Sequence, residues 1–395
     1  MKKLTFLMLL AALGGTLSAQ SSWIGQDASN KNYISTGMPI LLIAPDAVSA
    51  AMGDAGVAST PDAYSAHWNN AKFAFIDGNI GLSTTYTPWL RKLNVGDMNL
   101  FYLGGYYRIN DRSTAAMSLT YFTLGDIDMT DIDGQKINTL HPNEFAIDAT
   151  YALKVSDHLA LGATGRYMRS DLTNGQTISD GSGNTATQAA NSLAADIGLY
   201  FTDSIDEVQS YALGAFISNL GAKLSYSNDD NDKEFLPANL RLGGRYTNKL
   251  DSYNKISVLL DFNKLLVPTP PYTKDGVTYP SRYASNYTEY NNISVIAGAL
   301  QSFNDAPGGF EEEMQEIQIS AGAEYWYAET FAFRAGYFYE HANKGGRQYA
   351  TVGFGIRYSQ FSGDFAYLIP TTTVSTNSLA NTIRISIGWD MKPSK

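Results

Sequence analysis

The ten residues EFAIDATYAL, from Glu144 to Leu153, decide how this chain is expected to fold. Every second residue is apolar, namely Phe145, Ile147, Ala149, Tyr151 and Leu153. The residues between them are small or polar, and a period of two places the two sets on opposite faces of a β-strand. A tilted strand needs about ten residues to cross a bilayer. The stretch therefore predicts a membrane-crossing strand with one apolar face.

The same alternation recurs along the chain, in about 14 segments of strand length. HLALGATGRYM, FAFRAGYFYE and TIRISIGWDM are further examples. The predicted spans are residues 78–86, 97–109, 113–123, 143–154, 158–169, 192–202, 210–219, 238–247, 254–263, 313–327, 330–340, 348–358, 361–368 and 381–390. A bacterial single-chain barrel requires an even number of strands. The sequence therefore predicts an all-β fold, an antiparallel transmembrane β-barrel of about 14 strands.

The connections between these segments alternate in length. After the second segment, every other connection is short: 110–112, 155–157, 202–209, 248–253, 328–329 and 359–360. The others are long: 87–96, 124–142, 170–191, 220–237, 264–312, 341–347 and 369–380. Outer-membrane barrels have short periplasmic turns and long outside loops. The alternation therefore predicts long loops facing the cell exterior and both chain ends on the periplasmic side.

The composition also favours a barrel that faces lipid. Charged residues make up 17% of the chain, aromatic residues 12%, and there are 26 tyrosines and 35 glycines. Soluble domains usually carry about 25% charged residues. After the N-terminal stretch no segment approaches the ~20 apolar residues of a membrane helix, and only helices and closed barrels can span hydrocarbon. A soluble β-sandwich is the structural alternative, but it would expose a heavily charged face.

The N-terminus has the pattern of a secretory signal peptide. Lys2 and Lys3 precede the apolar run Leu4–Leu13, and Leu17-Ser18-Ala19 forms an imperfect cleavage site. A buried amphipathic helix is the alternative. The predicted organisation is a signal peptide over 1–19, an N-terminal segment over 20–77, a barrel over 78–390 and a periplasmic tail over 391–395.

Charge and cysteine content exclude several classes of partner and site. The formal net charge is −10, which argues against binding to nucleic acid. The chain has no cysteine, so disulfides, a lipobox acylation site and thiolate metal sites are excluded. The lipid bilayer remains the expected surroundings of the barrel.

Scattered charges fall on the alternating face that would line the lumen. The main candidates for a lumen charge network are Asp148, Arg166, Asp196, Arg241, Arg245, Asp261, Glu324, Arg334, Arg357 and Arg384. The two signs are nearly balanced, whereas a selective pore usually carries a ring of one sign. We therefore favour a structural ion-pair network over an ion-selective path, because an unpaired buried charge is costly.

The sequence offers little for catalysis. His67, His141, His158 and His341 are far apart, and none has a metal-ligand spacing. No Gly-x-Ser-x-Gly elbow is present. The acidic stretches 126–134 and 227–234 do not match the twelve-residue calcium loop and are expected to be solvated loops. We therefore predict a non-enzymatic protein without cofactor, metal or catalytic residue, although a Ser-His site assembled from distant strands stays an open alternative.

The longest connection, 264–312, is rich in Pro and Tyr and is a candidate contact surface. Connections of this size with exposed aromatics are usually functional or disordered. Tyrosine rings provide large contact areas at a low entropy cost. Its apolar stretch Ile293–Leu300 is expected to be a short helix or an extra strand.

Several motifs together resemble one known family. They are APDAVSAAMGDAGVASTPDAYSAHWNNAKFAF, TTYTPWLRKL, PNEFAIDATYALK, GRYMRSDL, FNDAPGGFEEEMQEI, GAEYWYAETFAFRAGYFYE and FAYLIP. In combination they are similar to the PorV family, outer-membrane barrels of the type IX secretion system of Bacteroidetes. The resemblance covers nearly the whole chain after the signal peptide. It implies a barrel like that of the long-chain fatty-acid transporters (FadL-like), with 14 strands and an N-terminal hatch.

The resemblance also implies a function in protein secretion. Members of the family are thought to bind the C-terminal signal domain of secreted cargo as it leaves the SprA translocon channel. They then deliver it to the attachment complex that includes the PorU-type sortase. On this basis we expect contact with cargo and translocon through outside loops. The candidate contact residues are Trp89, Leu90, Tyr272, Tyr279, Tyr283, Phe303, Phe310, Ile369 and Pro370.

The segment Ala51–Phe75 resembles the hatch of the fatty-acid-transporter superfamily. Those proteins usually have Asn-Pro-Ala where this chain has Asn69-Asn70-Ala71. Its small residues would allow close packing inside a narrow barrel, and its polar residues could pair with lumen charges and backbone amides. The hatch candidates are Asp54, Asp62, Trp68, Asn69 and Asn70. We expect this hatch to close the periplasmic end of the lumen.

Two other functions compete with secretion. A transporter of long-chain fatty acids or other hydrophobic small molecules would need a continuous apolar pocket from the loops to the hatch and a lateral opening in the wall. The charged lumen face counts against it. A lipid-modifying enzyme is the second rival. The identity of the cargo is beyond what the sequence can indicate.

Overall fold

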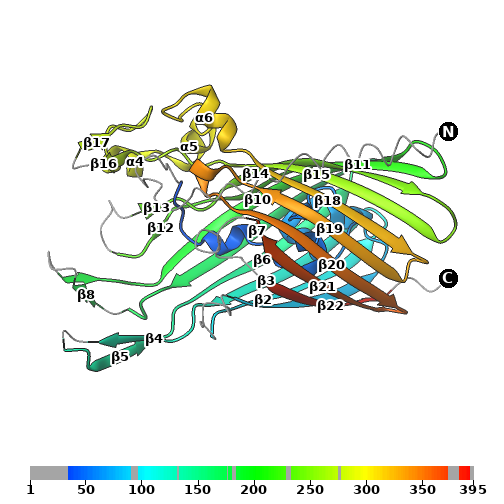
Figure 1. The fold of residues 1–395 in the computed structure, drawn as a ribbon, viewed down its shortest axis with the longest axis horizontal. Coiled ribbons are helices and arrows are strands. Elements are labelled where there is room, and N and C mark those ends of the chain that lie inside the picture. Colours follow the sequence, from blue (N-terminus) through cyan, green and yellow to red (C-terminus); the bar gives the residue numbers. More distant parts are fainter. Residues whose placement is uncertain are drawn as a thin grey trace. The chain divides into compact units, whose positions relative to one another are not determined.

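A closed barrel forms the main body of the computed structural model, which describes residues 34–89, 97–130, 133–175, 177–179, 184–227, 233–274, 277–371 and 382–391 (Figure 1). All neighbouring barrel strands pair antiparallel, and β1 (Ile80–Pro88) closes the barrel against β22 (Ile383–Met391). The strands between them are β2 (Asn99–Asn110), β3 (Ser113–Thr123), β6 (Asn143–Lys154), β7 (Leu159–Asp171), β10 (Ala190–Ser204), β11 (Gln209–Gly221), β14 (Asn239–Lys249), β15 (Asn254–Leu265), β18 (Gln318–Tyr327), β19 (Phe331–Tyr339), β20 (Gln348–Tyr358) and β21 (Phe361–Pro370).

The fold prediction is confirmed: each of the predicted segments overlaps one of these barrel strands. The alternation of β6 is the one expected, with Ile147 and Tyr151 facing outward and Asp148 buried. One boundary was wrong. Strand β18 begins at Gln318, five residues after the predicted start at 313, because residues 310–315 form the helix α6 (Phe310–Gln315).

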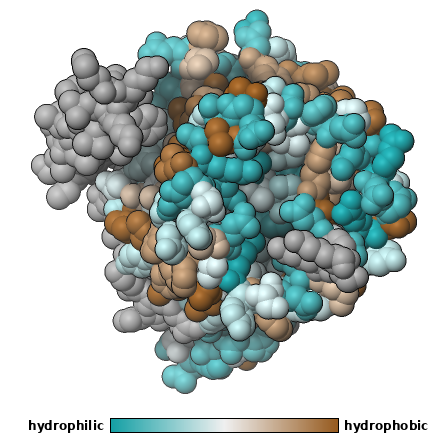
Figure 2. Space-filling view, turned by 90° about the vertical axis from the view of Figure 1, so that its right-hand side faces the viewer, coloured by the Kyte–Doolittle hydropathy of each residue, from teal (hydrophilic) through white to brown (hydrophobic). Residues whose placement is uncertain are grey.

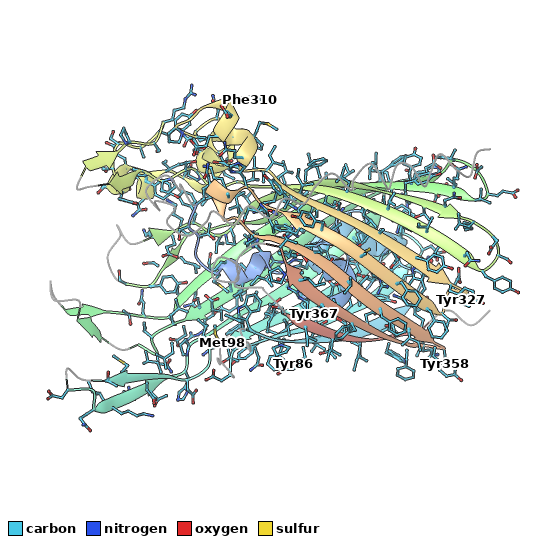
Figure 3. The ribbon with its side chains drawn as sticks, in the orientation of Figure 1. Tyr86, Met98, Phe310, Tyr327, Tyr358 and Tyr367 are labelled. Atoms are coloured by element: carbon cyan, nitrogen blue, oxygen red, sulfur yellow. The ribbon has the colours of Figure 1, made fainter. Side chains whose placement is uncertain are left out.

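Tyrosines mark the two ends of the outward-facing apolar surface. Tyr327 and Tyr358 lie near one end of the barrel, and Tyr86 and Tyr367 lie nearer the other (Figure 3). Aromatic girdles of this kind flank the apolar band of barrels that span membranes. Since a closed barrel pairs every strand edge, this wall can face hydrocarbon without leaving backbone amides unpaired.

The connections alternate as predicted, so that short turns gather at one end of the barrel. We call this end the short-turn end, and the opposite end the long-connection end. The long connections contain the hairpins β4 (Ile127–Thr130) with β5 (Lys136–Leu140), β8 (Thr177–Ser179) with β9 (Asn184–Ala186), β12 (Leu224–Ser225) with β13 (Lys233–Glu234), and β16 (Tyr272–Lys274) with β17 (Val277–Tyr279). Figure 1 shows them projecting at its left.

The longest connection carries three short helices. They are α4 (Tyr287–Asn292), α5 (Val295–Gln301) and α6, and we call residues 266–317 the loop cluster. The apolar stretch that was expected to be a helix or a strand is therefore the helix α5. None of the helices in the described part of the chain has the length and apolar character needed for a membrane span.

The N-terminal segment fills the lumen. We call residues 38–76 the plug; it contains η2 (Pro39–Leu42), α2 (Ala47–Ala50), α3 (Ser65–Trp68) and η3 (Asn70–Phe75). Most of its side chains are buried, and the ribbon of the plug lies inside the wall (Figure 1). Figure 2 looks at the short-turn end and shows hydrophilic residues around a hollow near its middle.

The plug runs along the barrel from one end to the other. At the long-connection end, the Gly37 amide donates to the Phe235 carbonyl over 2.9 Å. At the short-turn end, the Asn79 amide donates to the Met391 carbonyl over 2.9 Å, immediately before β1 begins. The described chain therefore starts and ends at opposite ends of the barrel. The two chain ends, both expected on the periplasmic side, lie outside the described residues. The plug, which was expected to close that end of the lumen, runs along the whole barrel.

Glycines in the wall make room for the plug. Gly336 in β19 faces the point where Met52 and Gly53 cross, and a Cβ atom there would lie under 3.0 Å from their backbone atoms. Gly53 itself has a φ of 67°, a conformation that L side chains rarely adopt. Wall and plug backbones therefore touch directly at this position.

Replacing Gly336 by valine is expected to keep the plug from seating, because the added side chain would collide with backbone rather than with a flexible side chain. We expect the amount of folded, heat-modifiable barrel in isolated membranes to fall by at least about fivefold. Gly165→Val in β7 is the matched control, since a Cβ atom at Gly165 meets nothing within 4 Å. Equal amounts of folded barrel for the two variants would contradict this prediction.

Candidate functional site

One buried carboxylate of the wall accepts hydrogen bonds from backbone amides of the plug. Asp261 in β15 accepts hydrogen bonds from the amides of Gly56 and Val57, over 2.7 and 2.9 Å. Asp261 is 1% exposed, and charge-assisted hydrogen bonds of this kind are stronger than neutral ones. Thr351 makes a similar clamp, accepting from the Gly53 amide and donating to the Ala51 carbonyl, each over 2.9 Å.

The polar residues that end the plug are bound to other parts of the plug and to the wall. Trp68 donates from Nε1 to Asp46 over 2.6 Å. Asn69 donates to the Leu199 carbonyl over 2.9 Å, and its Oδ1 accepts from the Ala71 amide as the cap of η3. Asn70 donates to the Thr164 hydroxyl over 2.9 Å. The two asparagines thus attach the plug to β10 and β7.

Two ion-pair groups lie in the wall beside the plug. Arg166 lies 2.6 Å from Asp148 through Nε and 3.0 Å from Asp196 through an NH2 group. It also binds Asn219, which has a φ of 60° at a bulge between β10 and β11. The side chains of Arg166, Asp148 and Asp196 are at most 5% exposed. Asn219 is buried as well, with 1% of its surface exposed.

Arg334 makes the second group with Glu324 and Asp364, each over 2.7 Å. Removing one partner of a buried ion pair costs about 3–5 kcal/mol, so both groups constrain the wall strongly. Apart from Asn219 and Asp364 they consist of predicted lumen residues. The first group lies on the successive strands β6, β7, β10 and β11, and the second on β18, β19 and β21.

The remaining arginines predicted for the lumen contact the plug or an aromatic ring. Arg241 donates to the His67 carbonyl over 2.7 Å and lies 5.0 Å from the centre of the Trp68 ring. Arg384 donates to the Ala44 carbonyl over 3.0 Å. Arg245 contacts Thr60 and Tyr200. Arg357 lies over the Trp326 ring. Four of the ten predicted lumen charges therefore contact the plug, namely Asp261, Arg241, Arg245 and Arg384. Five others form the two ion-pair groups of the wall.

The two acidic hatch candidates, Asp54 and Asp62, also accept hydrogen bonds. Asp54 accepts from the Tyr349 hydroxyl over 2.5 Å, and Asp62 accepts from the Tyr64 amide over 3.0 Å. Two small cavities border the plug near Ile43. Asp54, Arg241 and Arg347 line one of them, and Asp148 and Arg166 line the other. The spaces next to the plug are therefore partly charged, in contrast to the apolar pocket that a hydrophobic ligand would need.

The loop cluster displays apolar side chains to solvent. The exposed positions are Ile296 and Leu300 on one face of α5, Phe303 after it, and Phe310 and Met314 on one face of α6. We call these five residues the loop apolar face. Phe310 is 80% exposed and Leu300 72% exposed, and Figure 3 shows Phe310 on the outer side of the cluster. Large exposed apolar side chains that gather in one region mark interaction sites.

The loop cluster has a small core of its own that fixes these helices. Phe235, Val267, Ala284 and Tyr290 are buried together, and Ile34 of the N-terminal segment packs against them. Gly298, on the inner side of α5, lies against this core, so that the apolar residues on the other side face outward. The display of the loop apolar face is thus part of a packed structure.

The other predicted contact residues are distributed differently. Trp89 is 5% exposed and packs edge-on against Phe122, so it belongs to the interior of the barrel mouth and is not a surface contact. Tyr283 is exposed, and Tyr272 and Tyr279 pair across the hairpin β16–β17. Ile369 and Pro370 belong to the end of β21 rather than to a loop, because that strand runs two residues further than predicted. Leu90 lies outside the described residues.

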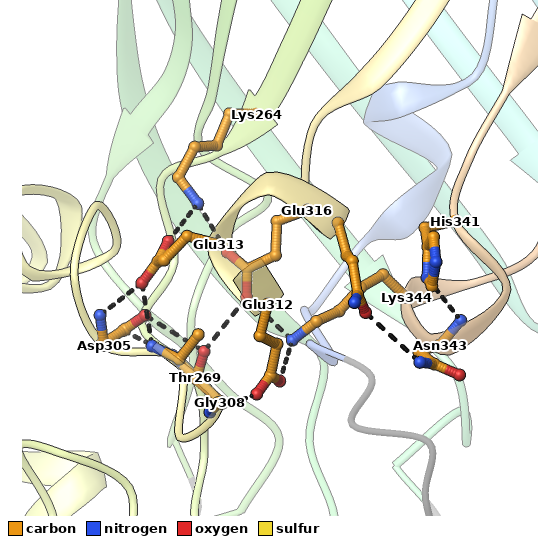
Figure 4. Close-up of polar contacts among 12 residues, drawn as sticks. Lys264, Thr269, Asp305, Gly308, Glu312, Glu313, Glu316, His341, Asn343 and Lys344 are labelled. Carbon is orange, nitrogen blue, oxygen red and sulfur yellow. Dashed lines mark hydrogen bonds and ion pairs between the residues drawn. The ribbon is translucent and has the colours of Figure 1, made fainter. Parts of the chain in front are cut away.

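A buried charged cluster beneath α6 was missed by the sequence analysis. It contains Lys264, Asp305, Glu312, Glu313, Glu316 and Lys344 (Figure 4). The run of three glutamates after Phe310 was the available signal, but it was divided between the long connection 264–312 and the predicted strand 313–327. Oxygens of Asp305, Glu313 and Glu316 approach one another as in metal sites. Each of them already accepts a hydrogen bond from an amide, a hydroxyl or a lysine, so the arrangement fits an ion-pair cluster.

The four histidines lie on different elements. His67 is in α3 of the plug, His158 in the turn before β7, and His341 directly before η5 (Ala342–Lys344). His141, after β5, contacts the exposed Asp126 over 2.7 Å. Asp128 of the same acidic stretch pairs with Lys136 across the β4–β5 hairpin. These contacts place the described part of that acidic stretch in a solvated hairpin.

Comparisons with known proteins give one family and several structures of similar fold. The family model described as type IX secretion system protein PorV matches residues 26–272, more than half of the chain. No curated protein matches the chain. The toluene transporter TbuX of Ralstonia pickettii is 12% identical with a TM-score of 0.50, over 88% of this chain and 98% of that one.

Two further structures are similar at the same level. The P. putida toluene transporter TodX is 11% identical with a TM-score of 0.51, over 89% of this chain and 99% of that one. The CymD monoaromatic hydrocarbon channel is 13% identical with a TM-score of 0.51, over 89% of this chain and 98% of that one. At these identities the similarity concerns the fold alone.

Proposed function

Because the chain belongs to the PorV family of type IX secretion system proteins, we propose that it is a non-enzymatic outer-membrane adaptor that binds other proteins of that system. The observation that carries this proposal is the loop apolar face, displayed on a packed loop cluster at the end of a plugged barrel. Large exposed apolar side chains favour protein contact, while a plug that is hydrogen-bonded to the wall disfavours passage of cargo through the lumen.

In the proposed cycle the long connections face the cell exterior. There the loop cluster contacts the SprA translocon channel and accepts the C-terminal signal domain of a cargo protein that leaves it. The adaptor then delivers the cargo to the PorU-type sortase of the attachment complex. The residues proposed for this contact are Tyr283 and the loop apolar face, which replaces the buried Trp89.

Transport of hydrophobic small molecules has weaker support. The cavities beside the plug are lined in part by Asp54, Asp148 and six other charged or amide side chains, namely Arg166, Asn239, Arg241, Asn263, Gln318 and Arg347. An apolar ligand would lose free energy against such a lining, because these groups would be left without water. Growth on long-chain fatty acids is therefore expected to be the same with and without the protein.

The adaptor function is tested at the loop apolar face. The double variant Leu300→Glu with Phe310→Glu is expected to recover at least about tenfold less translocon in a pull-down from membranes, because charged side chains would oppose burial in an interface. Cargo should then stay unprocessed and unanchored. Ile137→Glu in β5, at a side chain that is 66% exposed, is the matched control. Normal translocon recovery and normal cargo anchoring in the double variant would contradict the proposal.

A further inference from the structure

The charged cluster under α6 joins three parts of the chain. Lys264, at the end of β15, lies 3.1 Å from Glu313 and 2.5 Å from Glu316. Lys344, in the β19–β20 connection, lies 2.6 Å from Glu312 and 2.9 Å from Glu316. The two lysines therefore fasten α6 and the turn after it to the end of β15 and to the β19–β20 connection (Figure 4).

Asp305 holds the beginning and the end of the loop cluster together. Its two carboxylate oxygens accept from the amide and the hydroxyl of Thr269, over 2.7 and 3.1 Å. The Asp305 amide donates to Glu313 over 2.6 Å. These bonds connect the chain just after β15 with the segment that carries Phe303 and Phe310.

Negative charge exceeds positive charge inside this cluster. Four carboxylates face two ammonium groups, and no ion pair of Asp305 is present among the described contacts. The side chains of Lys264, Glu313, Glu316 and Lys344 are at most 11% exposed, and Asp305 is 1% exposed. Burying an excess of like charges is costly unless one group takes up a proton or a counterion.

The surroundings of Asp305 raise the pKa of its carboxylate. Burial is the largest cause that raises the pKa of Asp305, and the charges of Glu316 and Glu313 raise it as well. The hydrogen bonds from the Thr269 amide and hydroxyl lower it, and the resulting pKa is about 6. The other titratable groups of its surroundings are Glu312, Lys264 and Lys344 of the cluster and Tyr290 of α4. Among these, the Tyr290 hydroxyl donates to the Pro268 carbonyl over 3.1 Å.

We propose that the cluster is a proton-responsive clasp, which fastens the loop cluster to the barrel rim more tightly as the pH falls from neutral to about 5. The clasp stands on its own geometry, and only its effect on partner binding rests on the proposed function. A protonated Asp305 would keep the hydrogen bond from the Thr269 amide and could donate to the Thr269 hydroxyl. Its charge next to Glu313 and Glu316 would be removed.

The direction of the effect follows from the two states of the clasp. In the open, solvated state Asp305 has the ordinary pKa of an aspartate, near 3.8. The closed state binds the proton more tightly, so it gains stability as the pH falls through 6 and approaches 4. Above pH 7 both states are ionised, and this contribution opposes closure.

Hydrogen exchange on the full-length protein in detergent tests the clasp. The readout is the protection of backbone amides in residues 303–317, corrected for the intrinsic effect of pH on exchange. Between pH 7.5 and pH 5.0 we expect protection in the wild type to rise by up to about tenfold. Asp305→Asn removes the charge and keeps partners for Thr269, so its protection should be high at both pH values and change less than about twofold.

Asp128→Asn is the control, because it makes the same charge change at the exposed ion pair of the β4–β5 hairpin. This variant should respond to pH like the wild type in residues 303–317. A wild type whose protection is unchanged or falls toward pH 5, or an Asp305→Asn variant that keeps the wild-type response, would overturn the clasp. Since no partner takes part in this measurement, its outcome is independent of the adaptor function, which the pull-down tests separately.

Discussion

Deleting the plug, residues 38–76, is expected to turn a closed barrel into an ion-conducting pore. A barrel of about eight strands is filled by its own side chains, whereas wider barrels leave a channel unless something plugs them. The wall of this barrel carries glycines where the plug passes, so little would fill the space that the deletion leaves. In planar bilayers we expect the conductance to rise by at least about tenfold over that of the intact protein.

A milder variant separates plug release from failure to fold. Asp261→Ala removes the acceptor of the Gly56 and Val57 amides but leaves the plug in the chain. It should show brief openings at a frequency above that of the intact protein, while heat-modifiable mobility on gels reports that the barrel has formed. If a folded deletion variant conducts no more than the intact protein, the wall closes the lumen by itself and the plug is not the seal.

Single cysteines are expected to divide sharply between the two faces of the membrane. The chain has no cysteine of its own, so each introduced thiol is the only one that a maleimide can reach. Ser35→Cys and Glu311→Cys, both exposed at the long-connection end, should react with an impermeant maleimide on intact cells. Glu207→Cys, in the exposed turn between β10 and β11, should react at least about tenfold less until the cells are opened.

The labelling of Ser35→Cys is the sharper of these results. The sequence pattern alone placed both chain ends on the periplasmic side, whereas the plug carries the beginning of the described chain to the opposite end of the barrel. A different result would contradict this prediction: Glu311→Cys is labelled on intact cells, but Ser35→Cys is labelled only after the cells are opened. It would show that in the cell the segment around Ser35 does not lie at the long-connection end. Labelling of Glu207→Cys alone on intact cells would invert the proposed orientation.

The barrel could be predicted from the sequence because its physical cause is local. A strand between lipid and a polar interior must alternate, as Ile147 and Asp148 do, and a pattern of period two survives in every strand. The length of the connections gave the pairing order without any knowledge of contacts. The start of β18 was misplaced because the residues directly before the strand, which were counted as part of it, form the helix α6 and a turn.

The site could be predicted less well, because its parts meet only in three dimensions. Lys264, Asp305 and Lys344 come from separate connections, and nothing in their spacing indicates that they share one buried cluster. Trp89 was predicted to be a surface contact because it is an aromatic residue in a predicted loop. In the structure it is buried in one apolar cluster with residues of the plug. The small residues of the plug indicated close packing, whereas its path along the whole lumen depends on wall positions such as Gly336.

The way the plug is held also sets an order for assembly. Ala47 donates to Ser386 of the last strand over 2.9 Å, and Ala44 accepts from Arg384 of the same strand. These pairs are 339 and 340 residues apart in the sequence, so the plug is synthesised long before the strand that binds it. Contacts of such separation form late, because the intervening loop must first be closed. The barrel therefore has to close around a plug that is already inside, and β22 completes both in the same step.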